Sequence, residues 1–353
     1  MPDSQHTTES DPQEPSRSKA AQTARARPCQ YRVRAAWSLA LLATICAELT
    51  FTAIAVPETW LLLPLLLVMY GAGVVVVREV VVRAGGGWPS LVALAIAYQI
   101  AEDGLGLQAL TSPNMYGAAQ WGLRAGGINW TYWQSQLGVH IVLSVLVPTA
   151  ITNLLFPHLR TTPYLHRRGM IVTSALAIIG IAGLRTVISA TEDPGYQTPW
   201  PWTAVFIGLI AAAAWLGLRI LPRRQRMQSP IGHSAPHPIT IAVVSGTLTL
   251  VFLSVLLPLG LGPATLLGDT LALPLRLATG AGIAALFIWL ALRWRGTDDW
   301  NDNKRLTLIA GILIAHTAFM MPTSPKTATI GLIAICLQVA GLIFLCRHGK
   351  RPS

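Results

Sequence analysis

The sequence predicts an all-α protein, a bundle of about ten transmembrane helices with both termini in the cytoplasm. Three observations predict this fold class. Hydrophobic residues make up 52% of the 353 residues and charged residues only 12%, whereas about a quarter of the residues in a soluble globular chain are charged. Apolar stretches of membrane-crossing length recur along the chain. Lys and Arg gather in alternate connectors between these stretches.

The first predicted span covers residues 35–56. A crossing helix needs roughly 20 apolar residues, with about 17 as the lower limit. Nine further stretches reach that length, and 305–322 is the shortest of them. They cover residues 60–82, 88–110, 137–157, 169–190, 201–221, 239–259, 271–293, 305–322 and 327–346.

The basic residues support this count and set its orientation. With the N-terminus inside, all but four of the 26 Lys and Arg residues fall in connectors or ends on the cytoplasmic side. The exceptions are Arg124 and Lys326 in outer connectors and Arg185 and Arg276 within spans. Such an asymmetry follows the positive-inside rule, and one missed helix would reverse the side of every later connector.

Composition divides the chain into five parts. Residues 1–33 are polar and lack an apolar period, which predicts a disordered cytoplasmic arm. Residues 34–221 form a first membrane part with spans one to six, and 239–346 hold spans seven to ten. A cytoplasmic linker, 222–238, joins these two parts, and 347–353 form a short cytoplasmic tail.

Seven titratable side chains lie in the outer half of the predicted spans. Ionisable groups inside a membrane are costly and commonly mark a functional site. We therefore predict a site that binds a substrate or an ion there, with Glu102, Asp103 and His140 as the candidates for catalysis. The full candidate set is Glu48, Glu102, Asp103, His140, Arg185, Arg276 and His316.

Helical spacing predicts which polar side chains share a face. Gln99 and Asp103 are four residues apart, as are His140 and Ser144. Because lipid offers these groups no hydrogen-bond partner, each polar face should turn into the bundle. Neighbouring acids tend not to ionise together, so Glu102 and Asp103 suit proton transfer. The structural alternative is that each acid pairs with Arg185 or Arg276 and only fixes helix packing.

The chain lacks the sequence motifs of several common catalytic and metal sites. The chain has no HExxH, no Gly-x-Ser-x-Gly and no P-loop, and its four cysteines show no CxxC spacing. We therefore predict no metal and no cofactor. The net charge is +11, but the Lys and Arg residues that carry it flank apolar stretches. We therefore predict no nucleic-acid partner. The predicted partners are the lipid bilayer and a small solute, an ion or a proton.

The connector from Thr111 to Gln136 is rich in aromatic residues, among them Trp121, Trp130 and Trp133. Rings with a polar edge settle at the level of the lipid headgroups. The connector is therefore either an interfacial anchor or a lid over the outer end of the bundle.

Two local patterns resemble known families. Glu102-Asp103 in one span with His140 in the next loosely resembles the CAAX-protease-like intramembrane peptidases, which use Glu-Glu-x3-Arg and later His motifs. Leu107 stands where that Arg belongs, and neither FxxxH nor HxxxN surrounds His140. Residues 68–157 also resemble uncharacterised bacterial multi-pass membrane proteins. That likeness rests on Tyr70-Gly-Ala-Gly-Val, Arg78-Glu79, Gly87-Trp-Pro89, Glu102-Asp-Gly-Leu105, His140, Pro148 and Leu155-Phe-Pro157.

These observations favour a transporter or permease-like protein of the bacterial cytoplasmic membrane. Its polar cavity would bind and release protons in the outer half of the bilayer. An intramembrane hydrolase using the same acids and His140 is the first alternative, and a non-catalytic membrane subunit is the second. The missing catalytic motifs weigh against an enzyme without excluding one.

Overall fold

The first half of the chain forms a compact group of broken helices. In the computed structural model, residues 30–221, 234–262 and 264–348 are described. After a helix over residues 30–44 come elements named α for α-helix and η for 3-10 or π turns. They are η1 (Ile45–Leu49), α2 (Thr52–Ala55), η2 (Pro57–Leu62), α3 (Leu63–Leu66), η3 (Leu67–Gly71), α4 (Ala72–Arg83), α5 (Trp88–Gln99) and η4 (Ile100–Gly106).

The aromatic connector folds into short elements, and longer helices follow it. The connector holds η5 (Met115–Gly117), α6 (Ala118–Trp121) and an antiparallel hairpin of β1 (Arg124–Ala125) and β2 (Ile128–Asn129). The chain continues as α7 (Trp130–Val139), η6 (His140–Leu146), α8 (Val147–Leu155), η7 (Pro157–Leu159), α9 (Arg167–Gly183), η8 (Leu184–Ser189), α10 (Ala190–Glu192), α11 (Trp200–Trp215) and η9 (Leu216–Ile220).

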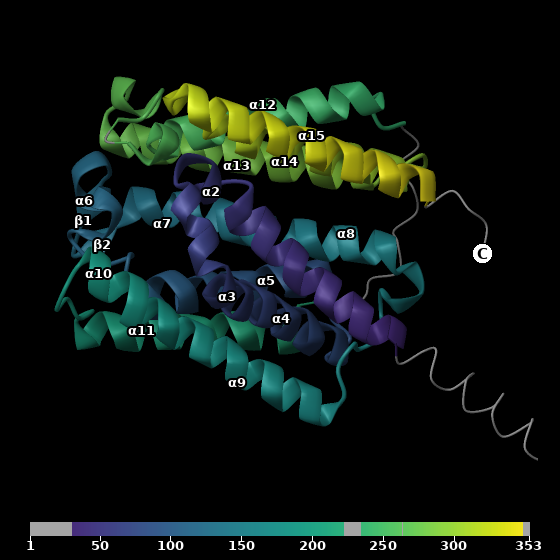
Figure 1. The fold of residues 1–353 in the computed structure, drawn as a ribbon, viewed down its shortest axis with the longest axis horizontal. Coiled ribbons are helices and arrows are strands. Elements are labelled where there is room, and N and C mark those ends of the chain that lie inside the picture. Colours follow the sequence, from purple (N-terminus) through teal and green to yellow (C-terminus); the bar gives the residue numbers. More distant parts are fainter. Residues whose placement is uncertain (1–29, 222–233, 263, 349–353) are drawn as a thin grey trace, which may run out of the picture.

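The last four long helices form a layer of their own, at the top of Figure 1. Gly246 and Gly311 let two of these helices approach closely, because a Cβ atom on Gly311 would lie 2.3 Å from the carbonyl oxygen of Ala242. Small residues serve this purpose at helix contacts in membranes. The elements are α12 (Pro238–Leu256), η10 (Leu259–Leu261), η11 (Gly268–Thr270), α13 (Leu273–Arg295), α14 (Asp302–Phe319), η12 (Met321–Thr323) and α15 (Pro325–His348).

This architecture confirms the prediction of an all-α transmembrane bundle. Among the described residues, 8 helices are long and apolar enough to cross a membrane. The two remaining predicted spans, 35–56 and 88–110, are also helical, but the first is interrupted and the second is shorter than predicted. The first is helical over residues 30–49 and bends at Thr50 and Phe51. The second ends as a helix at Gly106. The number of ten spans therefore stays a prediction.

The placement of the chain ends agrees with an even number of crossings. The start of the first helix, at residue 30, and the end of α15 lie at the same end of the bundle (Figure 1). Arg83, Arg160 and Arg295 belong to helix ends and connectors on that side, which we call the basic end. Most of the predicted arm, of the linker and of the tail (1–29, 222–233 and 349–353) falls outside the described residues, and residues 30–33 of the arm already belong to the first helix.

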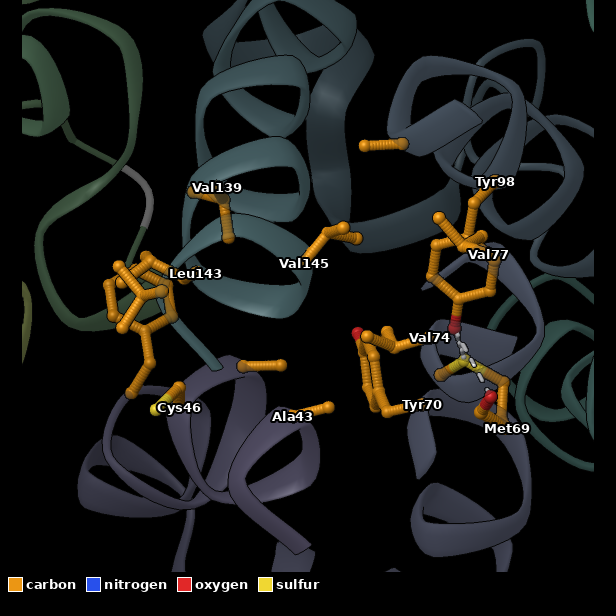
Figure 2. Close-up of a cluster of buried hydrophobic side chains, with 14 of the residues drawn as sticks. Ala43, Cys46, Met69, Tyr70, Val74, Val77, Tyr98, Val139, Leu143 and Val145 are labelled. Atoms are coloured by element: carbon orange, nitrogen blue, oxygen red, sulfur yellow. Dashed lines mark hydrogen bonds between the residues drawn. The ribbon is translucent and has the colours of Figure 1, made fainter. Parts of the chain in front are cut away.

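The core lies where the broken helices of the first half meet. Cys46, Tyr70 and Leu143 come from three separate helices and converge in Figure 2, with Tyr98 from a fourth beside Met69. The hydroxyl of Tyr98 donates to the carbonyl oxygen of Met69 at 3.3 Å and lies 2.8 Å from its sulfur. By contrast, α9, α11, α13 and α15 are only 11%, 11%, 11% and 6% buried over their most apolar windows, so they form the lipid-facing shell of the bundle.

Candidate functional site

The candidate site is built from wide turns of helix. Glu48, Tyr70 and His140 lie in the π-helical segments η1, η3 and η6, and Glu102 and Asp103 lie in η4. A π turn adds one residue to the helical circuit and occurs frequently at functional sites. Pro148 follows η6 and has no amide hydrogen to donate, which accounts for the interruption of regular α-helical bonding there.

His140 lies between two carboxyl groups. Its Nδ1 atom is 3.4 Å from Oε2 of Glu102, and its Nε2 atom is 3.5 Å from Oδ2 of Asp103. Nδ1 also lies 3.2 Å from the hydroxyl of Ser144. Both carboxyl side chains are fully buried and the His140 residue is 4% exposed. An imidazole in this position can pass a proton from one carboxyl group to the other.

Asp103 is held in place by neighbouring polar groups. The amide of Gln99 donates to Oδ2 at 2.7 Å, as the four-residue spacing predicts, and the hydroxyl of Tyr132 donates to Oδ1 at 3.0 Å. Trp133 in turn donates to Gln99 at 3.1 Å. Tyr132 and Trp133 belong to the first turn of α7, so the site lies near the end of the bundle covered by the aromatic connector.

Glu102 is bound far less tightly than Asp103. The hydroxyls of Tyr70 and Tyr98 lie close enough to interact with it electrostatically. No hydrogen bond of good geometry from the described residues reaches either of its carboxyl oxygens. Unpaired buried carboxylates are costly in an apolar medium. Glu102 can therefore take up a proton, or a cation that approaches its free oxygens, without first breaking a hydrogen bond of good geometry from the described residues.

Glu48 joins this cluster through Tyr70. The Tyr70 hydroxyl donates to Oε1 of Glu48 at 2.7 Å, and its ring stacks on His140 with the ring centres 5.9 Å apart. The four predicted residues Glu48, Glu102, Asp103 and His140 thus form one connected group, the carboxyl cluster, in which Tyr70 links Glu48 to His140. Tyr70, Tyr98 and Tyr132 were not among the predicted residues, although Tyr98 shares a helical face with Glu102. A tyrosine within an apolar span was the available signal.

The two arginines of the predicted set bind elsewhere. Arg276 donates to the carbonyl oxygens of Val255 at 2.7 Å and Leu256 at 3.1 Å, which caps the end of α12. Its third donor contacts the carbonyl oxygen of Trp121 at 2.7 Å. Arg185 donates to the carbonyl oxygen of Leu105 at 2.9 Å. Among the described contacts, neither arginine pairs with a carboxyl of the cluster.

The described contacts of His316 also lie outside the carboxyl cluster. Its ring stacks on Phe51 with the centres 3.9 Å apart, and both ring nitrogens are buried without a hydrogen-bond partner among the described residues. Within the same part of the chain, no three His, Cys, Asp or Glu side chains converge in a metal-binding arrangement. The chemistry that the cluster supports with its own groups is proton sharing.

The aromatic connector packs against this end of the bundle. Trp121 is 9% exposed, and Asn129 is fully buried with its amide donating to the carbonyl oxygens of Ala109 and Ser112. Gln108, with a φ of 59°, binds Ser189 and Thr198 through its side chain. The connector is therefore an ordered cap, and whether it opens as a lid stays a prediction.

Residues 38–211 match the model of an uncharacterized membrane protein family. The chain resembles that family over this segment. The matched segment extends beyond the predicted 68–157 in both directions and contains every residue of the carboxyl cluster, whereas Arg276 and His316 lie outside it. No curated protein and no solved structure matches the chain significantly. The likeness to CAAX-protease-like peptidases is not shown. With its apolar helices, the chain is a multi-pass membrane protein.

Proposed function

We propose that this protein is a proton-coupled carrier in the bacterial cytoplasmic membrane, in which Glu102, Asp103 and His140 exchange protons with a transported cation. One observation carries the proposal. His140 lies between two buried carboxyl groups, and the carboxyl oxygens of one of them, Glu102, receive no hydrogen bond of good geometry from the described residues.

The charge balance of the cluster supports this proposal. Glu48, Glu102 and Asp103 carry three negative charges when ionised, and protonated His140 carries one positive charge. A buried net charge is costly in low dielectric, so the cluster has to bind further protons or a cation. A cation that approaches Glu48 and Glu102 would displace a proton, and this competition is the elementary step of proton-coupled exchange.

The proposal can be tested in energised inside-out membrane vesicles. Acridine orange fluorescence reports the pH gradient, and Na⁺, K⁺ and tetraphenylphosphonium are added in turn. With the wild-type protein we expect at least one of these cations to restore fluorescence by exchange for protons. Glu102→Gln should abolish this recovery, whereas Glu58→Gln, at an exposed position, should retain it. Recovery that survives Glu102→Gln, or its absence with all three cations, would contradict the proposal.

A second candidate function is intramembrane hydrolysis. Ser144 lies 3.2 Å from Nδ1 of His140, and Asp103 lies at the other ring nitrogen. Nucleophile, base and carboxylate follow in this order in serine hydrolases, although there the serine contacts Nε2 and the carboxylate contacts Nδ1. A fluorophosphonate probe distinguishes the two functions in detergent, because it labels an activated serine. Labelling that is lost in Ser144→Ala favours the hydrolase, and an unlabelled protein excludes this serine mechanism.

A further inference from the structure

A second polar site lies at the basic end of the bundle and shares no residue with the carboxyl cluster. It is a cavity of about 360 Å³, within the lower part of the size range of ligand pockets. Its walls come from α4, α5, α8, α13 and α14, so it lies between the two layers of the fold. Four arginines line it, Arg78, Arg160, Arg295 and Arg305, and no Asp or Glu is among its described lining residues.

The positive charge around the cavity is only partly neutralised. Arg78 is paired with Glu79 at 2.8 Å and stacks on the ring of Tyr164. Arg160 and Arg305 share a single carboxylate, that of Asp302, at 3.1 Å and 2.6 Å.

The side chain of Arg295, an exposed residue, makes no ion pair or hydrogen bond with any other described residue. An excess of guanidinium groups is the usual means of binding phosphate or carboxylate.

Helix α8 presents two polar atoms without partners to the same cavity. The hydroxyl of Thr149, a residue only 5% exposed, and Oδ1 of Asn153 are buried, and neither makes a hydrogen bond within the described part of the chain. The two residues line the cavity and are four apart, so they share one face of α8. Leaving buried polar atoms unpaired is costly. These two atoms therefore point to a ligand that is polar as well as anionic.

The N-terminus of α5 opens into the cavity from another side. Gly86, Gly87 and Trp88 line it, and α5 continues for 12 residues. The first amide groups of a helix have no partner within the helix and carry a partial positive charge. A glycine-rich approach to such a terminus is a common way to bind phosphate. This feature alone would define no site, but it agrees in sign with the arginines.

We propose that this cavity binds a phosphate-bearing anion, supplied either by a lipid headgroup or by a soluble phosphate. Arg295 and Arg160 would donate to the phosphate oxygens. At the start of α5 the amide of Trp88 would face the same charge, since Pro89 has no amide hydrogen and the amide of Leu91 donates to Gly87. The Thr149 hydroxyl would donate to an ester oxygen beside the phosphate, and Oδ1 of Asn153 would accept from a hydroxyl group of the ligand. The site is independent of the proposed carrier function, because it shares no residue with the carboxyl cluster.

Binding can be measured on the purified full-length protein in neutral detergent, with tryptophan fluorescence following thermal unfolding during titration. One arm compares dioleoylphosphatidylglycerol with dioleoylglycerol, which lacks the phosphate. The other arm compares inorganic phosphate with chloride at equal ionic strength. We expect the unfolding temperature to rise with the phosphate-bearing compound in one arm or both. The lipid arm alone identifies a headgroup site, and the phosphate arm alone identifies a site for a soluble ligand.

Two variants and one control assign the binding to this cavity. Arg295→Gln should weaken binding about tenfold or more, since it removes one charge-assisted hydrogen bond. Thr149→Val keeps the shape of the side chain and should weaken binding by about fivefold. Arg293→Gln is the matched control, because Arg293 lies on the same helix, stacks on Trp289 and is not a lining residue. Its affinity should stay within about twofold of wild type.

Three results would overturn the proposal. The first is that, in both arms, the phosphate-bearing compound stabilises the protein no more than its reference compound does. The second is wild-type affinity in both Arg295→Gln and Thr149→Val. The third is equal weakening by Arg293→Gln and Arg295→Gln, which would indicate diffuse attraction by surface charge.

Discussion

His140 and Glu102 lie in contact, with Nδ1 3.4 Å from Oε2, although they belong to successive helices joined by an ordered aromatic connector. Asp103, the neighbour of Glu102 in sequence, contacts the opposite ring nitrogen. Adjacent residues of a regular α-helix point about 100° apart, and both side chains can reach one imidazole here because they lie in a π-helical turn. The local backbone irregularity is therefore part of the site.

Glu102 and Asp103 should respond differently to amide substitution. Asp103→Asn places an NH₂ group against the donors of Gln99 or Tyr132, so we expect it to destabilise the protein by about 1–3 kcal/mol. Glu102 receives no hydrogen bond of good geometry from the described residues, so Glu102→Gln should cost clearly less. Thermal unfolding in detergent measures both. Equal loss of stability would show that Glu102 is held as firmly as Asp103.

Arg276→Lys should destabilise the bundle despite preserving the charge. The guanidinium of Arg276 reaches three carbonyl oxygens, those of Val255, Leu256 and Trp121. A lysine ammonium is a compact point charge that cannot span this arrangement. We expect a loss of about 2–4 kcal/mol, measured by unfolding with increasing denaturing detergent. Wild-type stability in Arg276→Lys would mean that only the charge matters at the end of α12.

Acid should weaken the connector through Asp193. Partial burial opposes ionisation of Asp193, but hydrogen bonds from Ser112 and Asn114 outweigh it and lower its pKa below the ordinary value. A lowered pKa in the folded state means that this stabilisation is complete above about pH 4 to 5 and is lost as the pH falls through the folded pKa.

The test compares unfolding temperatures of wild type and Asp193→Asn from pH 6 to pH 3. The difference between them should shrink toward the acid end, because protonation removes the advantage of the carboxylate. The matched control is Glu192→Gln, at an exposed neighbouring position, which should follow wild type throughout. A difference that stays constant with pH would refute the role of ionised Asp193.

The contact between α12 and α14 should not tolerate a methyl group. A Cβ atom at Gly311 would lie 2.1 Å from the hydroxyl oxygen of Ser245 and 2.3 Å from the carbonyl oxygen of Ala242. We expect Gly311→Ala to cost about 1–3 kcal/mol by forcing the helices apart. Gly282→Ala on α13 meets open space and should be neutral or stabilising by up to about 1 kcal/mol. Similar unfolding curves for the two variants would argue against this close contact.

The sequence by itself determined that this is a helical membrane protein. A low content of charge and repeated apolar stretches leave the backbone no partners in lipid except its own, and helices satisfy that demand. The same reasoning identified Glu102, Asp103 and His140 as residues too costly to bury without a purpose, and the spacing of Gln99 and Asp103 predicted their hydrogen bond.

Only the tertiary structure decided which of these groups meet. Glu48 joined the carboxyl cluster through Tyr70, whereas Arg276 turned to the carbonyl oxygens at the end of α12. The arginine cavity at the opposite end is likewise lined by residues of five helices. It cannot be predicted from the sequence of any one of them. The physical reason is that helical periodicity gives the face of a side chain only within its own helix. The rotation of each helix against its neighbours, and the π turns that shift it, follow from packing of the whole bundle.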